Sequence, residues 1–258
     1  MQDFSRTWLD ALQDILTNGV EVSPRGKLTK EMPQRTLVVN TRRPVLTIPE
    51  RSLSYRFMAA EAYWILSGDD RVETIAPYNS RIKEFSDDGE RFFGAYGPKI
   101  REQLPYVVAK LLEDPDTRQA GLTIWRESPP QTKDVPCTVA IFFGIRNDML
   151  NCHVFMRSSD VWLGVPYDVF TFSMLTHLVS GLLNESLRSV QPGTLYLTAA
   201  SSHLYEPNWA DAKLCLSSLV REQPLTPTAY WTGLPGLVEG LKELRDTKPG
   251  NPLRWWEA

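Results

Sequence analysis

The chain has 258 residues, in which 28 Lys and Arg oppose 31 Asp and Glu to give a formal net charge of -3. This balance, with both signs interspersed, offers no basic surface for a nucleic-acid duplex or an anionic membrane. The 42% hydrophobic and 23% charged residues are typical of a globular protein rather than a disordered one, and the length favours a single domain over residues 1–258.

The sequence shows neither a targeting pattern nor a membrane-spanning one. Met1 is followed by Gln2 and Asp3 rather than by an apolar leader, and no apolar run approaches the roughly 20 residues that cross a bilayer. We therefore expect a cytoplasmic protein. Three cysteines are too few and too irregularly spaced for a disulfide framework or a zinc site, so we expect no metal and look for a reactive thiol.

The first half of the chain alternates helical and strand patterns. Apolar residues at helical spacing predict a helix that begins near Phe4 and ends before Gly19. The last helix of this half is predicted to carry Pro105 near its first turn, where a proline is tolerated. The elements predicted after the first helix are a strand over 35–40, helices over 53–66, 70–78 and 103–113, and a strand over 119–125.

The second half opens with two apolar runs within 139–156, joined by the turn-prone pair Asn147-Asp148. The elements predicted after this hairpin are a helix over 168–183, a strand over 193–200, and helices over 209–218 and 234–244. Strands that alternate irregularly with helices, some of them joined as hairpins, indicate an α+β domain built around a mixed sheet.

Glu61 lies on the apolar stripe of the helix predicted over 53–66, together with Phe57, Trp64 and Ile65, so it points inward. An unpaired buried charge is unfavourable, and such a carboxyl either finds a cation or takes a raised pKa. A salt bridge to a core arginine, a position at the rim of the helix and a functional carboxyl all fit the pattern.

Cys137 differs from the other two cysteines, which lie among apolar residues and are expected to be inert. It follows Pro136 at the mouth of a predicted strand, and Arg157 is expected at the end of the adjoining strand. A nucleophilic thiol needs access and a nearby cation, and Arg157 can supply the cation.

Arg157 is followed by Ser158, Ser159 and Asp160, and a guanidinium beside hydroxyls is a common way to hold a phosphate. A capped turn explains the same residues. Asp168 follows a proline and precedes a helical run, which is typical of a helix N-cap. Two further polar residues, His203 and Tyr205, fit equally well in a polar part of the core.

Taken together, motifs along nearly the whole chain resemble the thymidylate synthase family. Seven of them occur in family order, far more than a single pattern match. They are Arg25, the segment E-A-Y-W-I-L-S-G-D from Glu61, Tyr96-Gly97, D-P-D-T-R ending at Arg118, P-C at Cys137, R-S-S-D-V-W-L-G-V-P-Y-D from Arg157, and S-H-L-Y ending at Tyr205. The resemblance implies the family's fold, a large mixed sheet flanked by helices with one sheet face packed in a homodimer.

The resemblance also implies a mechanism, in which the Cys137 thiolate adds to C6 of a pyrimidine and C5 then attacks the methylene carbon of 5,10-methylenetetrahydrofolate. Glu61 would organise water and proton transfers at the ring. By the same resemblance, the catalytic group is completed by Tyr96 and Asp160. The 5′-phosphate would be held by Arg25, Arg157 and Ser158, with Arg118 reaching the phosphate of the other subunit. The sugar would be held by His203 and Tyr205, and the folate would lie at Asp160, Leu163, Gly164 and Ile82.

Departures from the family pattern concern the base. Synthases acting on dUMP have an asparagine where this chain has Asp168, and a carboxylate suits the N4 amino group of cytosine better than the O4 oxygen of uracil. Thr138 in place of a histidine and Met156 in place of a glutamine likewise resemble the deoxycytidylate hydroxymethylase branch. We therefore expect a dCMP 5-hydroxymethyltransferase, as implied for a bacteriophage that replaces cytosine in its DNA.

Ile82 and Phe85 occupy the segment in which synthases carry two tryptophans, and a smaller side chain at Ile82 would leave room for water at the C5 methylene. Phe92, Phe93 or Trp256 could refill this space. The alternatives are a dCMP methyltransferase that uses folate as hydride donor, a hydroxymethylase acting on CMP or dUMP, and a catalytically silent nucleotide- or RNA-binding homologue. Gln119 replaces a second family arginine beside Arg118, so Arg126 is a further candidate for the phosphate.

Overall fold

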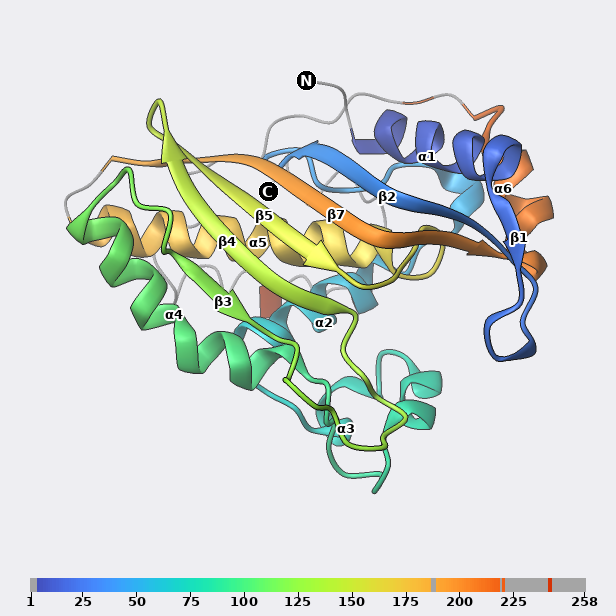
Figure 1. Ribbon diagram of the computed structural model, residues 1–258, viewed down its shortest axis with the longest axis horizontal. Coiled ribbons are helices and arrows are strands. Elements are labelled where there is room, and N and C mark those ends of the chain that lie inside the picture. Colours follow the sequence, from blue (N-terminus) through green and yellow to red (C-terminus); the bar gives the residue numbers. More distant parts are fainter. Residues whose placement is uncertain (1–3, 187–188, 219, 221–240, 243–258) are drawn as a thin grey trace.

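The computed structural model describes residues 4–186, 189–218, 220 and 241–242. Within them, seven strands form one mixed sheet in the order β1-β2-β7-β5-β4-β3, with β6 paired to β7 (Figure 1). The strands are β1 (Val20–Val22), β2 (Thr29–Asn40), β3 (Gly121–Thr123), β4 (Thr138–Arg146), β5 (Met149–Met156), β6 (Ser159–Asp160) and β7 (Gln191–Tyr205).

The β5 and β6 strands run parallel to β7, and the remaining pairs are antiparallel, which confirms the predicted mixed sheet. The helices are α1 (Phe4–Asn18), α2 (Tyr55–Leu66), α3 (Val72–Ile75), α4 (Tyr96–Glu113), α5 (Val165–Glu185) and α6 (Trp209–Cys215), with short 3-10 turns η1 (Pro24–Gly26), η2 (Pro49–Arg51), η3 (Ser80–Phe85) and η4 (Glu206–Asn208). None of the helices in the described part has the length and hydropathy that a membrane span requires.

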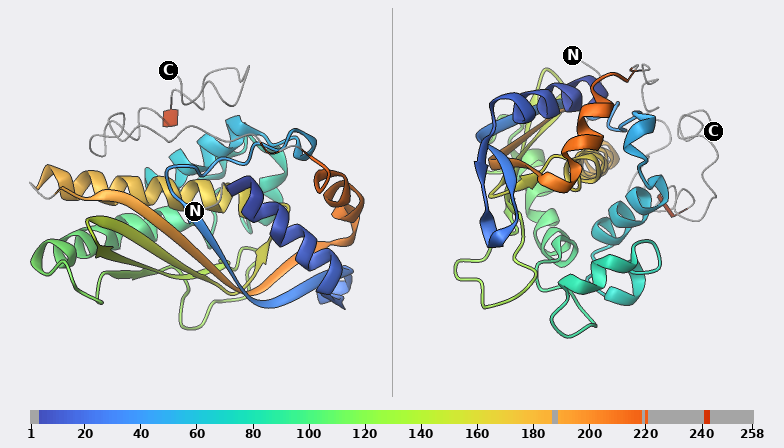
Figure 2. Two further views of the ribbon diagram at one scale, coloured as in Figure 1. Left: turned by 90° about the horizontal axis from the view of Figure 1, so that it is seen from above. Right: turned by 90° about the vertical axis from the view of Figure 1, so that its right-hand side faces the viewer.

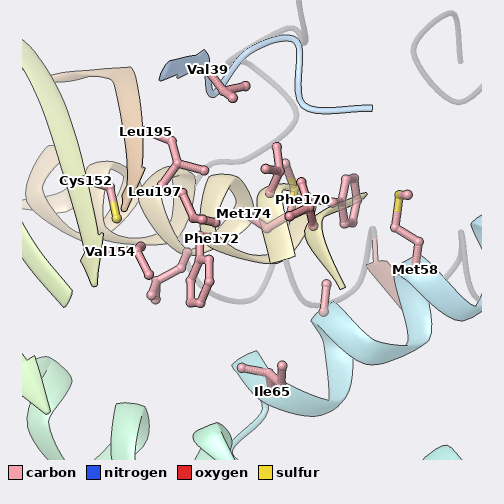
Figure 3. Close-up of a cluster of buried hydrophobic side chains, with 14 of the residues drawn as sticks. Val39, Met58, Ile65, Cys152, Val154, Phe170, Phe172, Met174, Leu195 and Leu197 are labelled. Atoms are coloured by element: carbon pink, nitrogen blue, oxygen red, sulfur yellow. The ribbon is translucent and has the colours of Figure 1, made fainter. Parts of the chain in front are cut away.

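The helix α5 is the centre of the core, because it is apolar on nearly all sides and packs between the sheet and α2 (Figures 1 and 2). Figure 3 shows Leu197 and Val154 of the sheet beside Phe172 of α5, with all three side chains buried. Full burial of one such side chain contributes about 1.5–3 kcal/mol. This packing holds α5 firmly against the sheet, and the first turn of the helix projects into the candidate site.

The helices gather on one side of the sheet, and the other face is open (Figure 2). Alternation along paired strands places Leu37, Val39 and Leu197 inward, while Val38, Phe142 and Phe155 point outward and are 40%, 40% and 46% exposed. The ring of His153 stacks on Tyr196 with centroids 4.8 Å apart. The outward face of this sheet is thus unusually apolar and aromatic.

Several elements have other limits than predicted. The helix expected at 103–113 begins at Tyr96, because Pro98 is the first-turn proline and Pro105 lies in the helix interior. The strand expected at 35–40 begins at Thr29, since Pro33 lies beyond the part of β2 that pairs with β1 and needs no donor on that edge.

The helix expected over 70–78 is reduced to the single turn of α3. The helix predicted over 234–244 lies outside the described residues except for Leu241, which is buried, and Lys242. By contrast, the hairpin at Asn147-Asp148 is confirmed, with φ of 51° and 58° at the two turn residues.

Candidate active site

Five of the residues predicted to bind a nucleotide line one open cavity of 710 Å³. It lies where the η1 turn, the segment after β5 and the end of β7 meet, so residues far apart in sequence converge there. They are Arg25, Arg157, Ser158, His203 and Tyr205. Lys133 lines the same cavity, so three cations and several hydroxyl or ring donors form a suitable site for a phosphorylated sugar.

Arg25 reaches this cavity from a strained turn. Its φ is 55°, a left-handed conformation that is uncommon outside glycine, and Gly26 continues the turn with a φ of 74°. The residue before Arg25 is Pro24, whose ring fixes its own φ. The backbone of η1 is therefore shaped to present an exposed arginine at the rim.

Arg157 is held by the loop that carries the thiol. Its Nε donates to the carbonyl of Pro136 at 3.0 Å and its Nη2 to the carbonyl of Val135 at 2.8 Å. The same Nη2 lies 3.7 Å from Cys137 Sγ, which places the guanidinium and the thiol in contact. The predicted pairing of a strand-end arginine with Cys137 thus has its geometry in the structure.

Cys137 immediately precedes β4 and is partly buried. Burial raises the pKa of its thiol, and the Arg157 and Arg25 guanidinium groups oppose that rise. Asp168 and Asp134 add to it. The two arginines are therefore the groups that favour the thiolate needed for nucleophilic attack.

A second cavity, of 170 Å³, collects the residues predicted to act at the base. Glu61, Tyr96, Ile82 and Asp168 all line it. Tyr96 contacts the residue that follows Cys137, because its hydroxyl accepts a hydrogen bond from the backbone N–H of Thr138 at 3.2 Å. Burial also raises the pKa of Tyr96, so its hydroxyl stays protonated.

Glu61 points inward as predicted. No arginine pairs with it in the part of the chain that the structure describes, which excludes the core salt bridge there. Burial, with a further contribution from the charge of Asp168, raises the pKa of Glu61 to about 8. A carboxyl in this state is mostly protonated at neutral pH and can donate a proton.

The N-cap interpretation of Asp168 is wrong. The helix α5 begins at Val165 with Gly164 as its cap, so Asp168 lies within the first turn and faces the cavity. A Cβ on Gly164 would lie 3.2 Å from Asp168 Oδ2, so that glycine leaves room for the carboxyl. Burial, and then the charge of Asp160, raise the pKa of Asp168 to about 7.

Asp160 organises the turn that leads into α5. Its Oδ1 accepts the backbone N–H groups of Trp162 at 2.8 Å and Leu163 at 2.9 Å, while Oδ2 is buried without a partner. Burial raises its pKa, and His203 is among the groups that lower it. The capped-turn explanation therefore holds for Oδ1, and Oδ2 remains available to a ligand. Leu163 is 55% exposed beside it.

His203 and Tyr205 end β7, with their rings edge to face at 5.2 Å. The His203 side chain is buried and its Nδ1 has no partner in the described residues. A buried ring nitrogen without a partner is unusual and is consistent with a ligand atom there.

Arg118 is not brought to either cavity. It is exposed on the loop between α4 and β3, at the opposite end of the sheet from η1 (Figure 1). Arg126, the other candidate for the phosphate, stacks over Phe93 at 4.1 Å and also lines neither cavity.

Asp134 was missed by sequence reasoning, although it lines the second cavity. Its Oδ2 accepts the backbone N–H of Gly94 at 2.7 Å. The available signal was an acidic residue three positions before Cys137, but the loop between them had no periodic pattern that could orient it.

Comparison with known proteins gives two findings. The family described as thymidylate synthase matches residues 6–229. The deoxyuridylate hydroxymethyltransferase of Bacillus phage SP01 is 30% identical over 268 aligned positions, which cover 95% of this chain and 67% of the phage protein.

Proposed function

The chain belongs to the thymidylate synthase family, which transfers one-carbon units to pyrimidine nucleotides with methylenetetrahydrofolate as co-substrate, and we propose that it is a dCMP 5-hydroxymethyltransferase. The observation that carries this proposal is Asp168, a carboxyl directed into the base cavity with a pKa of about 7. The nucleotide phosphate would occupy the cavity of Arg25 and Arg157, and C6 would lie at Cys137.

Cytosine offers an N4–H donor and an N3 acceptor at the edge that Asp168 would read. One carboxyl oxygen accepts from N4, and a proton shared between the other oxygen and N3 completes a two-bond pair. Such sharing is favourable because Asp168 binds its proton near neutral pH. With uracil, an ionised Asp168 would oppose the O4 oxygen, a mismatch of about 1–3 kcal/mol.

A second candidate substrate is dUMP. The name of the Bacillus phage SP01 relative favours it, since that protein is a deoxyuridylate hydroxymethyltransferase. A protonated Asp168 can also donate to O4 and accept from N3–H, as an amide does. The two substrates are separated by measuring tritium release from [5-³H]dCMP and [5-³H]dUMP in parallel. Faster release from dUMP at neutral pH would contradict the cytosine assignment.

The hydroxymethyl product is supported by the cavity around Ile82. That cavity has 170 Å³ of space beside Glu61 and Asp168, enough for water next to a C5 methylene. The relative's name likewise specifies hydroxymethyl transfer. A methyltransferase would release dihydrofolate, so a rise in dihydrofolate absorbance in step with product would contradict water quenching.

A homodimer through the open sheet face is part of the same proposal. Val38, Phe142 and Phe155 would leave water on pairing, and apolar faces of this kind are typical of homodimer interfaces. Arg118 would then contribute to the phosphate site of the other subunit, since it lines neither the 710 Å³ cavity nor the 170 Å³ cavity of its own chain. Phe155→Glu should yield a monomer in sedimentation equilibrium. A Phe155→Glu variant that remains dimeric would contradict this interface.

A further inference from the structure

Asp134 is held in place by a tight backbone contact. Its Oδ2 accepts the N–H of Gly94 at 2.7 Å. A Cβ on Gly94 would lie 2.4 Å from the Asp134 carbonyl oxygen and 3.0 Å from Oδ2, so the two segments approach as closely as glycine permits. The Asp134 carboxylate therefore has a fixed position in the wall of the 170 Å³ cavity.

The same cavity contains buried polar atoms without partners. Trp64, 6% exposed, has an unpaired Nε1–H, and Thr171, 2% exposed, has an unpaired Oγ1. Both residues line the cavity with Asp134. Buried polar groups are rarely left unsatisfied, and water is the usual partner where the site is polar and large enough. The cavity thus has the features of a water site.

The three carboxyls of the cavity are suited to different tasks. Burial and the charge of Asp168 raise the pKa of Glu61 to about 8, so Glu61 holds a proton at neutral pH. Asp168 is assigned to the base. Burial also raises the pKa of Asp134, but the Gly94 N–H opposes that rise by stabilising the charged form. Asp134 is the carboxyl of the three to which the described structure gives a backbone donor, and that donor favours the charged form, which is the form that can accept a proton.

We propose that Asp134 holds the water that adds to the C5 methylene and accepts its proton. This inference rests on the proposed hydroxymethyl transfer. After tetrahydrofolate has left, the intermediate carries an exocyclic C5 methylene conjugated with C4, and Cys137 bonded to C6. The water oxygen bonds to the methylene carbon, the water proton passes to Asp134, and the electron pair moves towards C4. The return of this electron pair restores the C5–C6 double bond and expels the Cys137 thiolate.

The test follows the fate of the intermediate in the full-length enzyme. Tritium release from the 5-labelled nucleotide counts methylene formation, and added 2-mercaptoethanol captures any methylene that water does not reach. In Asp134→Asn, tritium release should persist, while the ratio of thioether to hydroxymethyl product should rise by about 100-fold, the lower end of what a general base contributes. Asp134→Ser, which keeps an oxygen acceptor for Gly94, should behave alike.

Asp87→Asn is the matched control. Asp87 is exposed and joins the same two segments by accepting the backbone N–H of Lys133 at 3.1 Å and the hydroxyl of Thr132, yet it does not line the cavity. The charge of Asp87 is the smallest of the contributions that raise the pKa of Asp134, so the product ratio of Asp87→Asn should change far less than that of Asp134→Asn.

Three outcomes would overturn the role of Asp134. They are an unchanged ratio in both Asp134 variants, an equal change in Asp87→Asn, and loss of tritium release in both Asp134 variants, which would place the residue before the methylene. Failure of the proposed function is seen separately, as a methyl product of the wild-type enzyme.

Discussion

The role of the Asp168 side chain depends on its position in helix α5. A cap would direct its carboxylate at backbone N–H groups, whereas the observed position, four residues after Gly164, directs it into the cavity. Near it, Glu61 and Asp160 are half-buried. Burial and then the charge of Asp168 raise the pKa of Glu61, and burial and then the charge of Asp160 raise the pKa of Asp168. These raised pKa values are the physical basis for the base reading and proton transfer that we propose at neutral pH.

Asp168→Asn should shift the base preference towards uracil. An amide can donate to O4 and accept from N3–H without taking up a proton, and it no longer shares a proton with N3 of cytosine. The ratio of kcat/KM for dUMP to that for dCMP should rise by about ten- to hundredfold. Tritium release with both nucleotides measures this ratio, and an unchanged ratio would remove Asp168 from base recognition.

The pH dependence of the wild-type enzyme should differ between the two bases. Asp168, with its pKa raised to about 7, is protonated below that pH and loses its proton above it. Uracil requires the protonated form, so tritium release from dUMP should fall as pH rises through about 7, whereas dCMP should fall less because N3 shares the proton. Parallel pH profiles of kcat/KM test this, and superimposable profiles would contradict it.

At the scale of elements, the sequence predicted the features that depend on a few neighbouring residues, such as a tight turn or a long apolar helix. The Asn147-Asp148 hairpin was predicted because both residues tolerate positive φ, and the helix predicted over 168–183 is confirmed as the main part of α5. The start of α4 was not predicted, since Pro98 and Pro105 are equivalent signals until packing chooses between them. Asp134 could not be placed, because it lies in a loop without a periodic pattern and its partner Gly94 is 40 residues away in the sequence.

Gly94→Ala should damage the site through this contact between loops. The added methyl would lie 2.4 Å from the backbone oxygen of Asp134, which cannot rotate away, so the segment leading to Tyr96 must shift. We expect a loss of about 1–3 kcal/mol in stability and a fall in kcat/KM of about 100-fold. Thermal unfolding and steady-state kinetics measure the two effects.

Gly144→Ala is the control for this change, because no atom lies within 4 Å of its added Cβ. It should retain wild-type stability, and its activity is compared after sedimentation equilibrium has shown an unchanged oligomeric state, because Gly144 lies two residues from Phe142 on the open sheet face. Equal behaviour of the two variants would mean that the close approach at Gly94 does not position the site.

At the scale of the whole molecule, the two faces of the sheet have different surroundings. Its covered face anchors α5 and the cavities, and its open face presents Phe142 and Phe155. The sequence predicted strands from their apolar runs, but which of these apolar residues remain exposed depends on the order of the strands, and that order is not encoded locally. The order of the strands also places the loop of Arg118 at the opposite end of the sheet from η1 (Figure 1).

Mixing two inactive variants tests whether Arg118 acts across the proposed dimer. Arg118→Ala chains retain the thiol and Cys137→Ala chains retain the arginine, so a heterodimer would regain one complete site. Random exchange should restore roughly a quarter of wild-type activity, because half of the dimers carry one intact site of two. An Arg118 that acts within its own chain would give no recovery.

The most direct test of the central claim is mass spectrometry of the product formed by the wild-type enzyme from dCMP and methylenetetrahydrofolate. We expect 5-hydroxymethyl-dCMP with tetrahydrofolate as the other product, and a slower reaction with dUMP at neutral pH. A methylated product accompanied by dihydrofolate, or turnover of dUMP in the absence of any reaction with dCMP, would contradict this claim.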